Sequence, residues 1–170
     1  MNKDKRINFA NVYFGKNGNM FIDVEQRQPI VRVTAADGND FYLDKEGKKI
    51  PVSESSILRL PVATGHIDTY VNDYQNQLAH NLNQIYTIAN EIDEDPFLKS
   101  LIEQINVEED GSYVMVPKLG RNKITLGNET ALEDKLNKLK IYYKEGIKRV
   151  GLDRFSEINL SYEGHIVGIK

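Results

Sequence analysis

Short runs of alternating apolar and polar residues, separated by turn residues, dominate the first third of the chain. Residues 8–14 and 20–24 have the pattern of two strands joined by a turn at Asn17 and Gly18, two residues that tolerate positive φ. Val12 and Phe14 share one face of the first strand, and Ile22 and Val24 share one face of the second. This segment is therefore predicted to be a β-hairpin.

Further short strands follow the hairpin. They are predicted over residues 30–34 and 41–43, with Gly- and Asp-containing turns between them, and residues 60–65 close this part of the chain. Regular short strands with tight connections favour an antiparallel meander. Later in the chain, residues 101–107, 113–116 and 123–126 have the same strand-like character.

Two stretches have the apolar spacing of helices instead. The first carries one stripe at intervals of three and four residues, formed by Leu78, Leu82, Ile85, Ala89 and Ile92. Asp95 and Pro96 then have the residue types of the N-cap and first position of a short second helix. The order of strands and helices, with a second long helix described next, predicts an α+β fold. We expect a largely antiparallel β-sheet with two main helices.

The second main helix is predicted to begin at Thr130. Thr130 and Glu133 have the spacing of a capping box, in which both side chains bind unpaired N–H groups of the first turn. Its apolar stripe consists of Leu132, Leu136, Leu139, Tyr143 and Ile147.

Alternation returns over residues 157–162 and 165–170 and continues to the last residue. We expect a strand at a sheet edge here, with backbone groups open to a partner. Ile158, Leu160 and Tyr162 have one parity, whereas Val167 and Ile169 have the other. A turn or a bulge at residues 163–164 would reconcile the two, and we favour the turn.

Composition limits the function. The 170 residues suffice for one ordinary domain, or for one domain plus a fragment of another. A net charge of −3 disfavours nucleic-acid binding, which needs a clustered basic surface. Cysteine is absent, which excludes disulfides and thiolate chemistry. No apolar stretch approaches the length of a membrane span or of a signal peptide.

No pattern indicates catalysis. His66, His80 and His165 lack metal-ligand spacing, and neither a nucleophile elbow nor a phosphate-binding loop is present. The acidic turn at residues 37–40 lacks the glycine that a calcium loop requires. We therefore predict that the protein is not an enzyme and binds no cofactor, metal or small-molecule substrate. An enzyme would need a deep pocket with convergent polar groups.

Three stretches together resemble the extracytoplasmic part of the bacterial FtsQ/DivIB cell-division family. Residues 22–32 (IDVEQRQPIVR) are similar to the end of that family's POTRA domain. Residues 41–51 (FYLDKEGKKIP) and 60–65 (LPVATG) resemble the opening of its β-domain. The third stretch comprises ITLG from residue 124, the helix from Thr130, and INLSY from residue 158 followed by Val167 and Gly168.

The resemblance implies residues 1–33 as the C-terminal remnant of a POTRA domain and residues 34–170 as the β-domain. It implies that Met1 begins a fragment, and that an N-terminal transmembrane helix, absent here, anchors the full protein at the periplasmic face of the inner membrane. An isolated hairpin is marginal in water. We therefore expect the remnant either to extend the β-domain sheet of its own chain or to meet a second molecule, as a product of truncation.

The function that the resemblance implies is a non-catalytic divisome scaffold. Such a scaffold binds FtsB-like and FtsL-like division proteins through its C-terminal strand. By position, the partner-binding residues are Tyr162, Gly164, Val167 and Ile169. The competing interpretation of Tyr162 is a core position on an inner strand, and the alternative function is another POTRA-containing envelope-assembly module.

Overall fold

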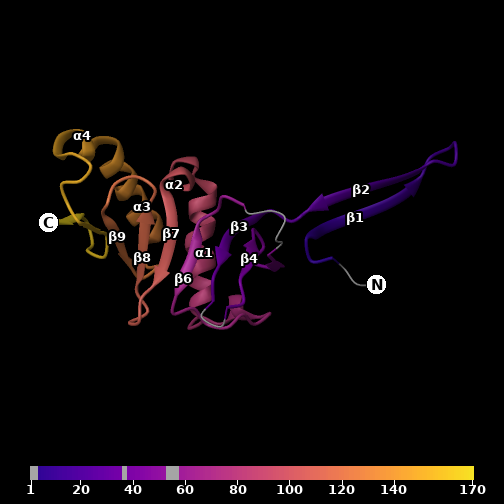
Figure 1. Cartoon of the computed structure of the whole chain (residues 1–170), viewed down its shortest axis with the longest axis horizontal. Helices are drawn as coiled ribbons and strands as arrows, with labels where there is room; N and C mark the ends of the chain where they lie inside the picture. The colour runs from indigo at the N-terminus through magenta and orange to yellow at the C-terminus, as the bar shows by residue number, and fades with distance from the viewer. Residues whose placement is uncertain (1–3, 36–37, 53–57) are drawn as a thin grey trace.

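The computed structural model describes residues 4–35, 38–52 and 58–170. Its strands form two separate sheets (Figure 1). The smaller sheet consists of β1 (Ile7–Phe14) and β2 (Met20–Gln26). The larger consists of β3 (Pro29–Val33), β4 (Phe41–Asp44), β5 (Lys49–Pro51), β6 (Val62–Gly65), β7 (Ile102–Val107), β8 (Tyr113–Pro117), β9 (Lys123–Gly127), β10 (Glu157–Asn159) and β11 (Val167–Ile169).

The larger sheet has the order β11-β10-β9-β8-β7-β6-β3-β4-β5. Five neighbouring pairs are antiparallel, and three pairs, β3–β6, β6–β7 and β9–β10, are parallel. The prediction of an α+β fold with a largely antiparallel sheet is confirmed. Each parallel pair is joined by a connection that contains other strands or helices, as parallel pairing requires.

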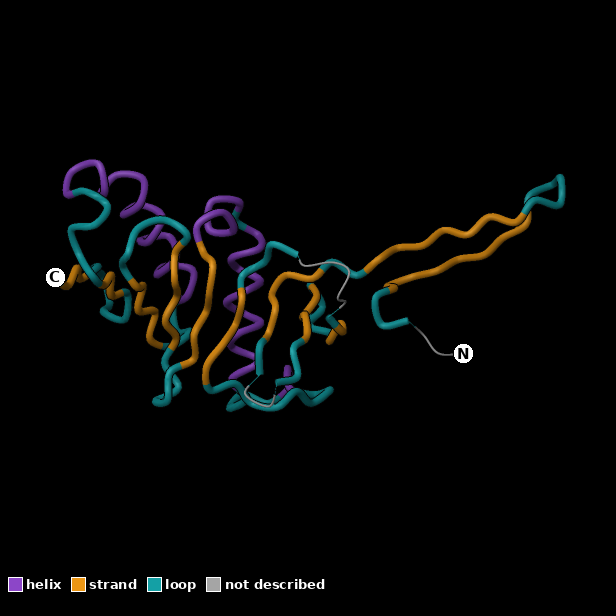
Figure 2. Tube along the Cα trace, viewed as in Figure 1, coloured by secondary structure: helices purple, strands orange, loops and turns teal. Residues whose placement is uncertain are grey.

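The helices lie together along one face of the larger sheet (Figure 2). They are the short η1 (Tyr74–Asn76), α1 (Asn81–Glu94), α2 (Pro96–Leu101), α3 (Leu132–Ile141), the π-helical turn η2 (Tyr142–Gly146) and α4 (Ile147–Val150). Alternate strand residues, such as Ile105 in β7 and Ile124 in β9, are buried in one core with Leu82, Ile85 and Leu136 of the helices. Most residues of the two predicted apolar stripes therefore supply the helical side of the core, and Leu78 and Ile147 do not belong to it.

The opposite face of the sheet carries two groups of hydrogen-bonded polar side chains, one on β6 and β7 and the other on β9 and β10. The hydroxyl of Thr64 donates to Oδ1 of Asn106 at 2.9 Å and accepts from Nε2 of Gln104 at 2.7 Å. The hydroxyl of Thr125 donates to Glu157 Oε1 at 2.8 Å. These side chains satisfy one another, which suits a sheet with one face on the core and the other open.

Both main helices begin later than their sequence patterns predict. Leu78 lies in a turn before α1 and is 87% exposed, so its assignment to the apolar stripe is wrong. The cap is His80, whose Nδ1 accepts the N–H of Leu82 at 3.3 Å. By contrast, the predicted start of α2 is confirmed, because Asp95 accepts the N–H groups of Phe97 and Leu98.

The capping box predicted at Thr130 is also wrong. Helix α3 begins at Leu132, and its N-cap Ala131 has a left-handed backbone (φ 52°) without a side-chain cap. The side chain of Asn128 instead accepts the N–H of Thr130 at 3.2 Å. A local Asx turn therefore takes the chain into α3 in place of the Thr/Glu pair.

The hairpin β1–β2 projects away from the nine-stranded sheet (Figure 1). Its register pairs Ala10 with Val24, Val12 with Ile22, and Phe14 with Met20. The expectation that it extends the β-domain sheet of its own chain is wrong, because β1 and β2 pair only with each other among the described strands. Two residues, Arg27 and Gln28, connect β2 to β3, the first strand of the larger sheet along the chain.

Candidate partner-binding edge

Strand β11 forms one edge of the nine-stranded sheet. It is antiparallel to β10, with Asn159 opposite Val167 and Glu157 opposite Ile169. Ser156 fixes its far end, donating from its backbone N–H to the carbonyl of Ile169 at 2.8 Å and from its hydroxyl at 3.2 Å. Within the described residues no strand lies on the other side of β11. Its outer row of backbone groups is therefore free to pair with an added strand.

Gly168 holds β11 close to the residues before β10. A Cβ atom at this position would lie 2.7 Å from the ring of Phe155, nearer than real contacts allow. Gly168 has no positive φ, so the reason for glycine here is space and not backbone conformation. A glycine within a strand often marks such a close approach.

The chain enters β11 through a tight turn. Residues 163 and 164 form the turn that the parity break predicts, and Gly164 has φ 78° with open space around it. The rings of Tyr162 and His165 stack across it at 6.0 Å between centroids, with planes 9° apart. The stack and the glycine together set the direction in which the edge strand leaves the turn.

The structure places the four predicted partner-binding residues in two groups. Val167 and Ile169 lie on one face of β11, opposite residues of the open polar face, and Ile169 is 42% exposed. Tyr162 and Gly164 lie in the turn. Tyr162 is 51% exposed while Ile158 and Leu160 are buried, so it is not a core residue of an inner strand. Whether these four residues bind a partner stays a prediction.

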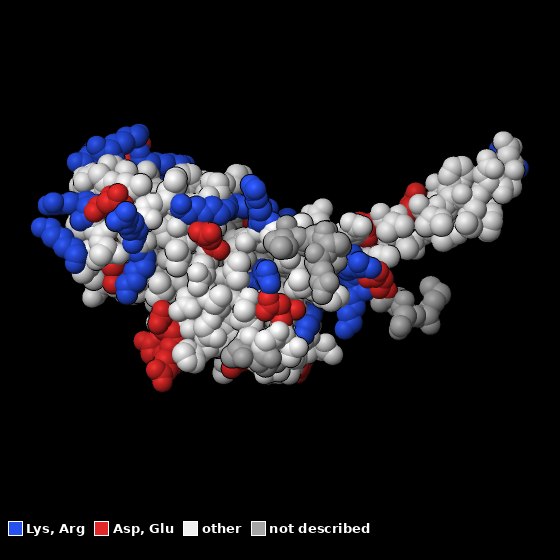
Figure 3. Space-filling view, in the orientation of Figure 1, with Lys and Arg blue, Asp and Glu red and all other residues white. Residues whose placement is uncertain are grey.

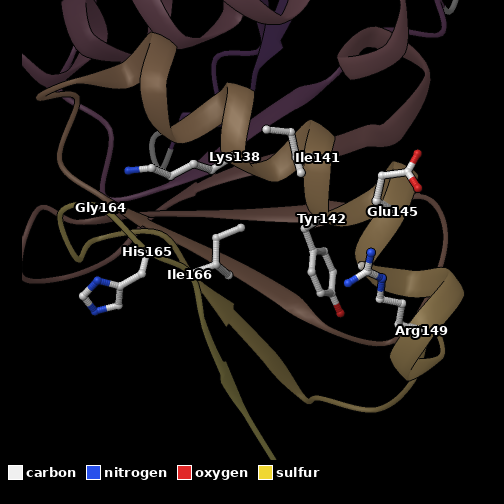
Figure 4. A pocket seen from close by; sticks show the side chains of 9 residues that line it. Lys138, Ile141, Tyr142, Glu145, Arg149, Gly164, His165 and Ile166 are labelled. Carbon is white, nitrogen blue, oxygen red and sulfur yellow. The ribbon is translucent and has the colours of Figure 1, made fainter.

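A groove lies beside the edge strand on the helical side of the sheet (Figure 4). It has a volume of about 450 Å³ and runs between α3, η2 and α4 on one side and residues 164–166 on the other. Its lining consists of Lys138, Ile141, Tyr142, Glu145, Gly146, Arg149, Gly164, His165 and Ile166. In Figure 4 the side chains of Ile141, Tyr142 and Ile166 lie between Lys138 on one side and Glu145 and Arg149 on the other.

The π-helical turn η2 shapes this groove. Gly146 lets the ring of Tyr142 lie against the turn, because a Cβ there would be 2.9 Å from that ring. Burial raises the pKa of the Tyr142 hydroxyl, which has no hydrogen-bond partner among the described residues. Single π-helical turns occur often at functional sites, and this one widens the helix where it faces the edge strand.

The surroundings of the groove are basic. Lys and Arg outnumber Asp and Glu over residues 118–170, whereas Asp and Glu outnumber Lys and Arg over residues 1–117. Figure 3 shows Lys and Arg side chains gathered at the end of the molecule that holds α4 and the C-terminus. Lys138 and Lys148 pair with Asp134 and Glu145, whereas no ion pair of Arg149 is found within the described residues.

Sequence reasoning missed the groove, and it also missed the close packing of Gly168 on Phe155. The residues of the groove come from segments about twenty residues apart, and no periodic pattern relates them. Gly168 could have been found, because a glycine in a strand-like run is itself a signal of close approach.

The described part of the chain contains neither a membrane-spanning helix nor a cluster of metal-ligand side chains. None of its helices is long and apolar enough to cross a membrane. Nor do three or more His, Asp or Glu side chains come together there as a metal-ligand set.

Comparison with known families identifies the fold that carries this edge. The model of the family described as FtsQ/DivIB, C-terminal related, matches residues 28–169. The chain belongs to this FtsQ/DivIB-related family. The match begins at Gln28, immediately before the first strand of the nine-stranded sheet, and ends at the last residue of β11. No curated protein matches the sequence.

Membership of the FtsQ/DivIB-related family implies a role in bacterial cell division. Proteins of this family are division scaffolds that act through interactions with other division proteins and not through catalysis. The matched region includes the edge strand, the turn before it and the helices that line the groove.

Proposed function

We propose that this chain is a non-catalytic divisome scaffold whose edge strand β11 takes up an extended segment of an FtsB-like protein, itself associated with an FtsL-like protein. The observation that carries the proposal is an edge strand with unpaired backbone groups in a family of division proteins. Backbone pairing along the edge supplies affinity, and side chains on either face supply specificity.

The two edges of the nine-stranded sheet differ in a way that favours β11. The other edge, β5, has Lys49 at its start and Pro51 at its end. A charge and a proline are common protections against strand addition, because proline removes a donor and lysine resists burial. Strand β11 has the sequence Val-Gly-Ile and carries neither device. Of the two, β11 is the edge that an added strand can extend.

The groove gives the added segment a second point of attachment. In an added strand, successive side chains point alternately to the two faces of the sheet. One set would lie over Val167 and Ile169 on the open face, and the other would point toward the groove beside Ile166. An apolar side chain of the added segment could pack against Ile141 and Tyr142, which line the groove. Specificity would thus come from both faces of one strand.

The family membership favours this scaffold over another envelope-assembly module with POTRA domains. Of the residues 1–33 predicted as a POTRA remnant, Pro29–Val33 form β3 of the nine-stranded sheet. We also propose that the hairpin before them is the end of a POTRA domain. Six apolar residues share one face of the hairpin, and Phe14 among them is 74% exposed; they are Ala10, Val12, Phe14, Met20, Ile22 and Val24. Such a face in water calls for a cover, and preceding POTRA residues would supply it.

The binding proposal is tested by calorimetry with a synthetic segment of the FtsB-like protein from the same genome. Deletion of residues 164–170, or Tyr162→Ala combined with Val167→Glu, should abolish binding while far-UV circular dichroism shows a folded domain. Lys49→Glu on the β5 edge is the matched control and should bind like the parent. Undiminished binding by the folded truncation would show that β11 is not the site.

The POTRA proposal has a separate test in sedimentation. If the apolar hairpin face associates only because its cover is missing, the 170-residue chain should dimerise at high concentration and a longer chain with the upstream residues should be monomeric. Equal dimerisation of both would refute this assignment of the hairpin.

A further inference from the structure

Arg27 stands between the two sheets of the molecule. Its backbone N–H donates to the carbonyl of Arg6 at 2.9 Å and so continues the ladder of the β1–β2 hairpin. Two residues later Pro29 begins β3, where it lies opposite Asp44 of β4. Only Arg27 and Gln28 separate the last residue of β2 from the first residue of β3. Gln28 precedes a proline, and a residue in that position is restricted to extended conformations.

The side chain of Arg27 crosses from the hairpin to the nine-stranded sheet. Its Nη1 lies 2.6 Å from Oδ2 of Asp44, and the Arg27 side chain is only 14% exposed. Asp44 is fully buried. Glu46 lies at 3.8 Å from the same nitrogen but is largely exposed, so Asp44 is the main partner. An ion pair held out of water in this way is far less screened than a surface pair.

Asp44 is itself fixed by the turn between β4 and β5. Its other oxygen, Oδ1, accepts the N–H groups of Glu46 at 3.0 Å and Lys48 at 2.7 Å. The carbonyl groups of the turn are held from the helical layer: Tyr86 donates to Lys45 and Tyr74 to Gly47, both at 2.7 Å. The carboxylate that receives Arg27 is therefore part of a rigid socket.

Among residues 4–35, 38–52 and 58–170, few other contacts hold the root of the hairpin. Two cavities, of about 730 and 410 Å³, lie between the hairpin and the larger sheet, and Arg27 lines both of them. The hairpin strands pack chiefly on each other. The direction in which the hairpin projects is thus set at Arg27 and at the stiff step through Gln28 into Pro29.

We infer that Arg27 is a positioning residue, a strut that fixes the angle between the β1–β2 hairpin and the nine-stranded sheet by inserting its guanidinium into the Asp44 socket. The hairpin and β11 lie at opposite ends of the molecule (Figure 1). The contact between Arg27 and Asp44 therefore sets the distance between the free edge of β11 and the hairpin at the other end of the molecule. Without it, the hairpin swings about residues 27–28 while both sheets keep their structure.

Electron–electron distance measurement between two spin labels tests this inference directly. The chain has no cysteine, so Asn17→Cys at the hairpin turn and Glu103→Cys on β7 give one label in each part. The parent should show one narrow distance distribution. Arg27→Gln should broaden it at least twofold. Asp44→Asn should do the same. Its side-chain oxygen can still accept the N–H groups of Glu46 and Lys48, whereas its NH2 group cannot accept a hydrogen bond from the guanidinium of Arg27.

Glu46→Gln is the matched control and should leave the distribution narrow, because it removes only the distant exposed carboxylate. A second label pair, Glu103→Cys with Lys123→Cys, reports on the nine-stranded sheet and should be unchanged in every variant. If Asp44→Asn fails to fold, Arg27→Gln decides the matter. A distribution in Arg27→Gln as narrow as in the parent would overturn the inference, as would equal broadening by Glu46→Gln.

Discussion

The contact between Gly168 and Phe155 predicts the effect of a single methyl group on the edge strand. Gly168→Ala places a Cβ 2.7–2.8 Å from three ring carbons of Phe155. Overpacking of this kind costs about 1–3 kcal/mol. The backbone at Gly168 is not in the left-handed region, so no conformational cost adds to this figure.

The cost should appear as local opening of β11 and not as global unfolding. The strand has three residues and one neighbouring strand, so its release breaks few contacts of the core. About 1.4 kcal/mol corresponds to a tenfold change in an equilibrium. Exchange of those amides in residues 167–169 that bond to β10 should therefore accelerate roughly ten- to hundredfold. Thermal unfolding of the remaining sheet should change little.

Two further variants make this prediction specific. Phe155→Leu combined with Gly168→Ala should restore slow exchange relative to Gly168→Ala alone, because the ring that causes the clash is gone. Gly164→Ala meets no atom within 4 Å but has φ 78°, so it reports the backbone cost alone. The steric reasoning is refuted if Gly168→Ala exchanges like the parent, or if the Phe155→Leu background gives no rescue.

Two other predictions concern the helices. Leu82→Ala in the core should lower the free energy of unfolding by about 2–5 kcal/mol, whereas Leu78→Ala, in the exposed turn, should change it by less than about 0.5 kcal/mol; urea denaturation measures both. The hydrogen bond from Lys140 lowers the pKa of Asp95, with further help from two backbone N–H groups at the start of α2. A lowered pKa in the folded state means stability that is present above the unfolded pKa of about 4 and is lost as the pH falls below it. Asp95→Asn should keep the cap but reduce the loss of unfolding free energy between pH 5 and pH 3. Asp95→Ala should in addition lower the free energy of unfolding by about 1 kcal/mol at pH 7. If Asp95→Asn lost as much stability between pH 5 and pH 3 as the parent, this assignment would be contradicted.

Local chemistry explains which elements the sequence could predict. The β1–β2 hairpin follows from alternation and from a turn that contains Asn17 and Gly18, and α2 follows from Asp95 and Pro96. The start of α1 could not be predicted from the sequence, because histidine is not a usual N-cap. Only the fold brings Nδ1 of His80 to the N–H of Leu82. In each confirmed case the residues that decide the structure are close in sequence.

The order of strands in the sheet and the groove depend on contacts between distant residues. The parallel pairs β3–β6 and β9–β10 join segments about thirty residues apart, and a single sequence has no pattern that relates them. The same holds for the socket around Asp44, which needs Tyr74 and Tyr86 from the helical layer. The four predicted edge residues, in contrast, lie within eight positions of one another, and alternation sufficed to place them at a turn and a strand.

Amide hydrogen exchange of the chain with and without the FtsB-like segment tests the central claim most directly. Strand addition would give the outward-facing backbone groups of β11 new hydrogen-bond partners, so exchange of the outward-facing amides in residues 167–169 should slow at least tenfold on binding. The opposite edge, β5, should exchange at the same rate in both states. Protection at β5, or binding without any protection at β11, would contradict the account.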